Sequence, residues 1–409
     1  MDSLRESILS RQPNQQSKWK QFLEERNLLV DKFNELDWSG RGQHAEFQIN
    51  EASEIPLKSV NVLGHTANAF VESVLCRRIL LARKTINCHR RIKREDAIKE
   101  VEHLQRLKHT HIIQVVGTYT FARNLSILLY PVAEYNLDTF LEEIQEPERT
   151  KEFYSMEQSL RAFFGCLSST LSFIHDALTK HLDIKPKNIL VKDMGSRGVQ
   201  TSGNGPINLR YKIIIADFGI ARSYNSEEEL ETETPVSFTR AYAAHEVIAQ
   251  ERRGLAADVF SLGCVFAEML ATFANTTIES FRRRDGLLHW KCVIEPPKPD
   301  LDHCKELRNA RIANEYGDIS YQANLPEIRR CVSQACLDIY KYRDLLLDPN
   351  IEFSRVRDVM LLMLDPVPDG RPSATDLCAF FKTTAFLHSC SCLKRPEPFE
   401  ATKEYESLV

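Results

Sequence analysis

The sequence predicts an α+β fold with a small, strand-rich lobe followed by a larger, mainly helical lobe. Between residues 58 and 135, short segments rich in β-branched and aromatic residues are interrupted by a single segment with helical spacing. From residue 136 onward, apolar residues recur at helical spacing over long segments. The chain has 409 residues, 43% of them hydrophobic, which is enough for more than one compact unit. We expect an N-terminal helical extension (1–55), a strand-rich lobe (56–135), a helical lobe (136–390) and a C-terminal tail (391–409).

The N-terminal extension contains the segment SKWKQFLEERNLLVDKFNELDW, residues 17–38. Its apolar side chains fall near helical spacing with charged residues between them, which predicts one amphipathic helix. An amphipathic helix has to cover its apolar face. Packing against its own domain is favoured over binding a separate partner, and both alternatives stay open.

The strand-rich lobe begins with three short segments typical of strands, SVNVLG, AFVESVLCRR and ILLARKTIN. The segment IKREDAIKEVEHLQRLK then places apolar residues at helical spacing, and HIIQVVGTY and LSILLYPVA return to strand character. This order predicts a small sheet with one inserted helix.

The helical lobe contains four segments with a clear apolar face: SLRAFFGCLSSTLSFIHDAL, DVFSLGCVFAEML, RVRDVMLLMLDP and SATDLCAFFKTT. Between the first two, the polar stretch at residues 192–206 predicts a flexible loop. The longest apolar stretch, residues 259–274, is shorter than the ~20 residues that span a bilayer and contains Glu268. We expect a buried core helix there.

The bulk properties indicate an intracellular protein. The net charge of −4 gives no reason to expect a nucleic acid or a membrane as partner. The eleven cysteines lie in apolar contexts, and the first residues show no basic region followed by an apolar core. Free thiols in a cytoplasmic or nuclear compartment are therefore expected.

The polar residues that indicate chemistry are concentrated in two loops. In HLDIKPKNIL, residues 181–190, Asp183, Lys185 and Asn188 lie between a predicted helix and a predicted strand. A second apolar segment, YKIIIADFG, leads to Asp217. A helix–loop–strand–loop–strand order brings both loops to the same end of a strand pair. Two carboxylates and an amide suit Mg²⁺ that bridges phosphate oxygens, and a lysine can neutralise a transferring phosphoryl group.

With these motifs, residues 58–390 resemble the eukaryotic protein kinase family. HLDIKPKN resembles its catalytic loop, DFG at 217–219 is intact, and LARK at 81–84 is similar to the strand that carries the lysine for ATP. AHE at 244–246 resembles the end of the activation segment, and DVFSLG the helix after it. Lys185, the lysine two residues after the aspartate in DIKPKN, is similar to the lysine found at this place in serine/threonine-specific members. Two apolar segments, LSILLYPVA and DVFSLGCVFAEML, resemble kinase domains of filamentous fungi.

The resemblance implies a bilobal protein-kinase-like fold, ATP and Mg²⁺ as cofactors, and a protein substrate. Asp183 would orient or deprotonate the substrate hydroxyl, and Lys185 would stabilise the transferring phosphoryl group. Asn188 and Asp217 would hold Mg²⁺. The resemblance further implies an ATP-binding set of Lys84, its ion-pair partner Glu100, Gly64, Val71, Ala82 and Leu129. It also implies that Asp258 braces the catalytic loop, that Arg371 pairs with Glu246, that Thr239 lies near Asp183, and that His181 has a packing role.

Two departures from the family pattern bear on activity and regulation. The phosphate-covering loop GHTANAFV has Thr66 and Ala69 at the second and third glycine places, where side chains hinder a close approach of the backbone to phosphate. Leu182 replaces the arginine that would bind an activation-loop phosphate, so switching by such a phosphate is not expected.

An acidic segment is a candidate substitute for that phosphate. Residues 227–233 carry five glutamates, whereas residues 77–108 carry 11 basic and 4 acidic residues, a net charge of +7. The acidic loop could dock on this basic region and hold Glu100 inward. A solvated charged loop is the favoured alternative.

Three functions remain open. An active serine/threonine protein kinase is favoured, because a non-catalytic fold need not keep Lys84, Glu100, Asp183, Asn188 and Asp217 together. The altered glycine loop supports a pseudokinase scaffold as the alternative. AHE and DVFSLG argue against a small-molecule kinase, since they resemble a platform for protein substrates.

Overall fold

The computed structural model describes ten stretches of the chain, residues 17–30, 34–65, 69–90, 92–145, 150–195, 209–230, 238–251, 253–285, 302–342 and 353–383. They divide into two compact units. Unit 1 holds the residues up to Gln105 together with Gln114–Tyr130, and unit 2 holds Arg106–Ile113 and the residues from Pro131 onward. The predicted tail (391–409), Thr66 and most of the loop predicted at 192–206 lie outside the described residues.

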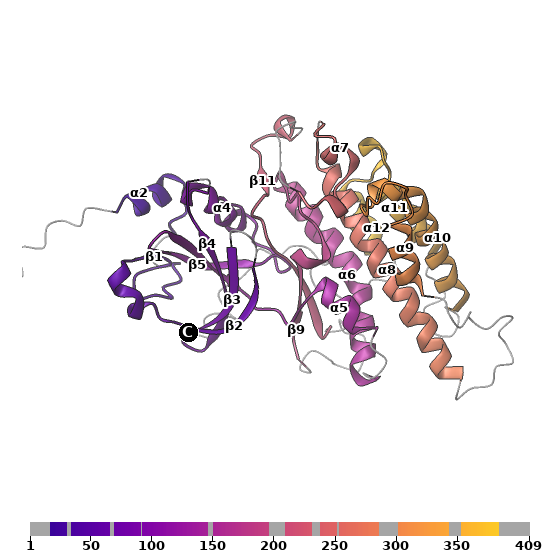
Figure 1. Ribbon diagram of the computed structural model, residues 1–409, viewed down its shortest axis with the longest axis horizontal. Helices are drawn as coiled ribbons and strands as arrows, with labels where there is room; N and C mark the ends of the chain where they lie inside the picture. Colours follow the sequence, from indigo (N-terminus) through magenta and orange to yellow (C-terminus); the bar gives the residue numbers. More distant parts are fainter. Residues whose placement is uncertain are drawn as a thin grey trace, which may run out of the picture. The chain divides into compact units, whose positions relative to one another are not determined.

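Unit 1 is built on a six-stranded sheet in the order β1-β5-β6-β4-β3-β2 (Figure 1). Its strands are β1 (His44–Phe47), β2 (Leu57–His65), β3 (Ala69–Cys76), β4 (Ile79–Asn87), β5 (Gln114–Phe121) and β6 (Asn124–Tyr130). Between β4 and β5 lie α3 (Arg94–Ala97) and α4 (Lys99–Arg106). The sheet with one helical insertion is confirmed, although the predicted helix is two short helices that meet at Ile98.

The N-terminal helix is much shorter than predicted. Helix α2 (Lys18–Glu25) begins after Ser17, whose Oγ accepts a hydrogen bond from the Lys20 amide at 3.0 Å. It ends where Asn27 adopts a left-handed conformation, with φ of 55°. The Leu28 amide then donates back to the Leu23 carbonyl at 3.0 Å, the geometry of a Schellman cap. Asparagine tolerates this conformation, so Asn27 ends the helix despite the continuing apolar pattern.

The residues after α2 join the sheet rather than extend the helix. Strand β1 pairs in parallel with β5, from His44 opposite Thr118 to Phe47 opposite Phe121. The indole of Trp38 donates to the Gln43 carbonyl at 2.9 Å and packs in the core of the unit. This packing requires a glycine at 117, where a Cβ would stand 2.5 Å from the indole nitrogen of Trp38.

The strand registers show which side chains lie on each face of this sheet. Val71 lies opposite Lys84, and Ala82 lies opposite Leu129. Because residues directly opposite each other share a face, as do residues two apart, these four side chains line one face. The other face is covered by a core cluster of Trp38, Ala45, Phe47, Val74, Cys76, Leu81, Val116, Tyr119 and Leu128.

Unit 2 is mainly helical, as predicted. Its principal helices are α5 (Leu137–Glu143), α6 (Thr150–Asp176), α7 (His245–Ile248), α8 (Ala256–Asp285), α9 (His303–Ala310), α10 (Leu325–Tyr342), α11 (Phe353–Met363) and α12 (Ala374–Thr383). Its short strands are β7 (Tyr135–Asn136), β8 (Thr179–Lys180), β9 (Ile189–Asp193), β10 (Tyr211–Ile215) and β11 (Arg222–Ser223). The strands form the ladders β10-β9-β7 and β11-β8.

Helix α8 contains the longest apolar segment. Its residues Ala256–Thr276 are long and apolar enough to cross a membrane, but 89% of the most apolar window is buried within the protein. That burial is what the prediction of a core helix requires. The eight cysteines among the described residues are free thiols.

Candidate active site

In unit 1, the predicted ion pair between β4 and α4 is present. The ammonium of Lys84 lies 2.7 and 2.9 Å from the two carboxylate oxygens of Glu100. Glu100 is only 3% exposed, so this charge is paired where water has little access. The pair fixes the direction of the lysine at the face of the sheet shared with Val71, Ala82 and Leu129.

The remaining ATP-binding residues predicted in unit 1 surround this lysine. Gly64 of β2 lies opposite Val71 of β3, which in turn lies opposite Lys84. A Cβ at Gly64 would meet no atom within 4 Å, so packing within the chain does not explain this glycine. The structure thus brings the predicted set together on one face, although their role toward ATP stays a prediction.

In unit 2, the catalytic loop is anchored to the buried carboxylate of Asp258 at the start of α8. The backbone amides of His181 and Leu182 each donate to it at 2.8 Å, and the His175 ring lies 3.2 Å away. Burial raises the pKa of Asp258, but the hydrogen bonds from His175 and His181 outweigh it, so the net shift is downward. The predicted bracing role of Asp258 is confirmed.

His181 joins the two loops that carry the predicted site. Its Nε2 donates to the Ala216 carbonyl at 3.1 Å, and its Nδ1 accepts from the Asp183 amide at 3.3 Å. Its ring also packs edge-on against Phe218 at 4.6 Å. The imidazole is engaged at both nitrogens and one edge, as a packing residue would be.

The carboxylate of Asp183 is held by three side chains. Oδ1 accepts from the Thr239 hydroxyl at 2.6 Å. Oδ2 accepts from the Lys185 ammonium at 2.6 Å and from the Asn188 amide at 2.8 Å. Lys185 also donates to Thr239 at 2.7 Å, which closes a polar network around one carboxylate. A carboxylate fixed in this way can orient a hydroxyl group and accept its proton.

The two loops that carry the oxygen donors predicted for Mg²⁺ meet at one end of a pair of strands. Strands β9 and β10 pair antiparallel up to Ile189 opposite Ile215, and the Ala216 amide donates to the Asn188 carbonyl at 2.9 Å. Asp217 follows directly in a left-handed conformation, with φ of 63°. The side-chain amide nitrogen of Asn188 donates a hydrogen bond to Asp183 Oδ2 at 2.8 Å, which leaves the amide oxygen out of this hydrogen bond. A carboxylate and an amide oxygen are a donor set that fits Mg²⁺, which takes its other ligands from water and phosphate.

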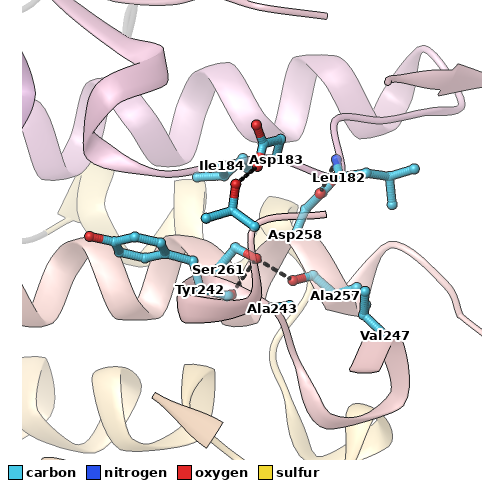
Figure 2. A pocket seen from close by; sticks show the side chains of 10 residues that line it. Leu182, Asp183, Ile184, Tyr242, Ala243, Val247, Ala257, Asp258 and Ser261 are labelled. Atoms are coloured by element: carbon cyan, nitrogen blue, oxygen red, sulfur yellow. Dashed lines mark hydrogen bonds between the residues drawn. The ribbon is translucent and has the colours of Figure 1, made fainter. Parts of the chain in front are cut away.

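A small pocket opens beside Asp183 (Figure 2). In the figure, Leu182, Asp183 and Ile184 lie above the pocket, and Tyr242 and Ser261 lie below it. The pocket is also lined by Thr239, Ala243, Val247, Ala257 and Asp258. The carboxylate of Asp183 therefore lies next to the segment that the resemblance assigns to the protein substrate.

That segment is tied to α8 through a residue whose role the sequence did not indicate. Glu268 accepts hydrogen bonds from the hydroxyls of Tyr242 at 2.9 Å and Tyr321 at 2.7 Å. Burial raises the pKa of Glu268 more than these hydrogen bonds lower it. The only sign of this role in the sequence is that Glu268 is a charged residue within a long apolar stretch.

Glu246 and Arg371 form the predicted pair. The guanidinium lies 2.6 and 3.0 Å from the two carboxylate oxygens, and its side chain is fully buried. It also donates to the carbonyls of Ala256, Asp365 and Pro366. The end of the activation segment is thereby fixed to α8 and to the loop before α12.

Comparison with known proteins agrees with these features. The family described as "Protein kinase domain" matches residues 58–380. Cyclin-dependent kinase 4 from Xenopus laevis is 32% identical over 179 residues, which cover 42% of this chain and 48% of that protein. The protein of the same name from Mus musculus is 32% identical, with 51% of its length covered. Cyclin-dependent kinase D-1 from Arabidopsis thaliana is 31% identical over 176 residues, 37% of its length. The matched region thus spans about half or less of these relatives.

Proposed function

Because the chain belongs to the protein kinase family, we propose that it transfers the γ-phosphoryl group of ATP to serine or threonine hydroxyls of protein substrates. The observation that carries this proposal is the carboxylate of Asp183, held at once by Thr239, Lys185 and Asn188. The serine/threonine preference is supported by Lys185, which donates hydrogen bonds to both Asp183 and Thr239.

In the proposed reaction, Asp183 orients the substrate hydroxyl and accepts its proton. The hydroxyl oxygen forms a bond to the γ-phosphorus while the bond to the bridging oxygen of ATP breaks, and ADP leaves. Lys185, beside Asp183, neutralises charge on the transferring group. Lys84, held by Glu100, binds ATP phosphates in unit 1. Asn188 and Asp217 would hold Mg²⁺, which would neutralise charge on the phosphates.

An assay of the full chain with radiolabelled ATP and a generic basic protein tests this function. We expect label on serine or threonine, and we expect it to be lost when EDTA removes Mg²⁺. Label on tyrosine would overturn the proposed specificity. No transfer, together with a thermal shift caused by a bound partner, would favour the pseudokinase alternative, which the substitutions at Thr66 and Ala69 support.

The N-terminal helix is proposed to act within its own chain rather than on a separate partner. Arg26, at its C-terminal end, forms an ion pair with Glu102 of α4 at 2.6 Å. The Gln105 side chain donates to the Leu28 carbonyl at 3.2 Å, and Leu28 is buried. Glu102 lies two residues after Glu100, so a helix held here also steadies the partner of Lys84.

Reversing the charge at either end of this pair tests the proposal. Arg26→Glu and Glu102→Arg are each expected to raise the KM for ATP by up to about fivefold, since exposed ion pairs contribute no more than ~1 kcal/mol. The double reversal should restore the value. Single variants whose KM equals that of the wild type would contradict the proposal.

Regulation without an activation-loop phosphate is also proposed, because Leu182 cannot bind one. This proposal does not require the acidic segment at residues 227–233 to dock on the basic region at residues 77–108. Of the five glutamates, Glu231 and Glu233 lie outside the described residues. Glu228 and Glu229 are exposed, and Glu229 accepts a hydrogen bond at 3.2 Å from the Asn225 amide of its own loop, which supports the solvated alternative. An intracellular location, the absence of nucleic-acid and membrane partners, and the resemblance to fungal kinase domains stay predictions.

A further inference from the structure

A buried lysine lies directly before the catalytic loop. Lys180 ends the two-residue strand β8, two positions before Leu182, and only 1% of its surface is exposed. Its ammonium donates to the Leu230 carbonyl at 2.6 Å and to the Arg253 carbonyl at 3.1 Å. It also stands 4.7 Å from the ring centre of Tyr224. The proposed reaction does not use this lysine.

The carbonyls of Leu230 and Arg253 and the ring of Tyr224 belong to separate parts of the chain. Tyr224 follows β11 at the start of the activation segment, and Leu230 lies six residues further along. Arg253 lies after α7, beyond the end of the segment. One side chain therefore connects the strand that leads into the catalytic loop with the beginning and middle of the activation segment and with the residues after it.

Further contacts show that this junction is built around β8. Strand β11 pairs with β8, with Arg222 opposite Lys180. The hydroxyls of Thr179 and Ser223 lie 2.9 Å apart, and the Tyr224 amide donates to the Leu178 carbonyl at 3.0 Å. The segment runs on to Thr239, whose hydroxyl donates to Asp183.

A charge at this depth has to be compensated. Moving an ammonium group out of water is costly unless hydrogen bonds replace its hydration. Carbonyl oxygens accept from an ammonium more strongly than from a neutral donor, and an aromatic face attracts the cation. Burial lowers the pKa of Lys180, as expected where desolvation opposes the charge. An apolar residue at position 180 would avoid the free-energy cost of burying a charge. The presence of a lysine there therefore points to a role for its ammonium group.

We propose that Lys180 is a positioning residue that holds the activation segment through the carbonyls of Leu230 and Arg253. In kinases with an arginine at the place of Leu182, a phosphate on the activation segment binds that arginine and holds the segment in position. In this chain, Lys180 would hold the segment without a phosphate. This inference rests on the proposed kinase function for its effect on catalysis, whereas the clamp itself is a property of the fold.

The first arm of the test compares the full-length wild type before and after treatment with a protein phosphatase. If Lys180 holds the segment, both preparations should phosphorylate the basic protein at the same rate within about twofold. A loss of tenfold or more on dephosphorylation would overturn the proposal, because the segment would then need its phosphate.

The second arm compares Lys180→Met, which keeps the length and removes the charge, with Lys180→Arg, which keeps the charge. For Lys180→Met we expect backbone amides of residues 222–230 to exchange about 10- to 100-fold faster with solvent. We expect kcat to fall by a similar factor while the KM for ATP stays within about twofold. Lys180→Arg should recover most of both. Unchanged exchange and unchanged kcat in Lys180→Met would overturn the clamp.

The third arm adds the arginine that the chain lacks. In Lys180→Met/Leu182→Arg, activity should depend on phosphorylation of the segment and fall on phosphatase treatment, unlike in the wild type. If this double variant stays indifferent to phosphatase while Lys180→Met is active, position 180 does not replace position 182 and the proposal fails.

Two further measurements keep the outcomes separate. If Lys180→Met does not fold, Tyr224→Leu, which removes the ring beside the ammonium, should show intermediate exchange of residues 222–230, and wild-type exchange would overturn the clamp. If the wild type transfers no phosphate, the proposed function fails, but amide exchange still decides whether Lys180 holds the segment.

Discussion

Replacing Arg371 by alanine is expected to destabilise unit 2 by about 3–5 kcal/mol. The guanidinium is fully buried and lies 2.6 and 3.0 Å from the Glu246 carboxylate oxygens. Alanine would leave the Glu246 carboxylate, only 4% exposed, without its partner. It would also leave the carbonyls of Ala256, Asp365 and Pro366 without their donor. Urea unfolding followed by circular dichroism measures the loss.

A matched control is available in α11, the helix that precedes Arg371 in the chain. Arg357 and Asp358 form an ion pair at 2.7 Å, but their side chains are 35% and 58% exposed. Arg357→Ala should therefore change the free energy of unfolding by less than about 1 kcal/mol. If Arg371→Ala cost no more than Arg357→Ala, the assignment of the Glu246–Arg371 pair as the anchor of the activation segment would be wrong.

Asp183→Asn is expected to lower kcat by about 10²- to 10⁴-fold, the range for loss of a positioned general base. The carboxylate accepts from Thr239 on one oxygen and from Lys185 and Asn188 on the other. An asparagine keeps the shape of the side chain but can neither take up a proton nor accept hydrogen bonds on its nitrogen. Initial rates at saturating ATP, compared with the wild type, measure the effect.

A second aspartate serves as control for this substitution. Asp138 at the start of α5 is 41% exposed and lies 4.0 Å from Lys187. Asp138→Asn should retain activity within about twofold. Equal activity of Asp183→Asn and Asp138→Asn would show that phosphoryl transfer does not pass through Asp183, or that the assay reports a contaminating kinase.

Most secondary structure could be predicted because it is encoded locally. The segment ILLARKTIN is β4 (Ile79–Asn87), and the helical spacing from Leu160 to Ile174 lies within α6 (Thr150–Asp176). In both, the spacing of apolar residues repeats over enough positions to identify the element. The two-lobed arrangement follows from the order of these elements.

The N-terminal region shows where local patterns fail. The apolar spacing continues past Glu25, but one asparagine in a left-handed conformation stops the helix. The parallel pairing of β1 with β5 joins residues more than 70 positions apart, and Trp38 packs where residue 117 is a glycine. Such contacts depend on three-dimensional packing and leave no periodic signal in the sequence.

The predicted site shows the same division. Glu100, Asp183 and Asn188 could be identified because each has a side chain whose chemistry suits its predicted role and lies in a recognisable motif. Lys180 could not, because its acceptors are backbone carbonyls of Leu230 and Arg253, which any residue supplies. Glu268 was missed for a related reason, since Tyr242 and Tyr321 approach it from distant parts of the chain.

The central claim is that this chain catalyses phosphoryl transfer through Asp183 without a phosphate on its activation segment. The most direct test is the initial rate at which the phosphatase-treated full chain transfers the γ-phosphoryl group of ATP, with Mg²⁺, to serine or threonine of a protein substrate. The account predicts that the dephosphorylated wild type stays active and that its Asp183→Asn variant is at least about 100-fold slower. A dephosphorylated wild type no faster than the variant would contradict it.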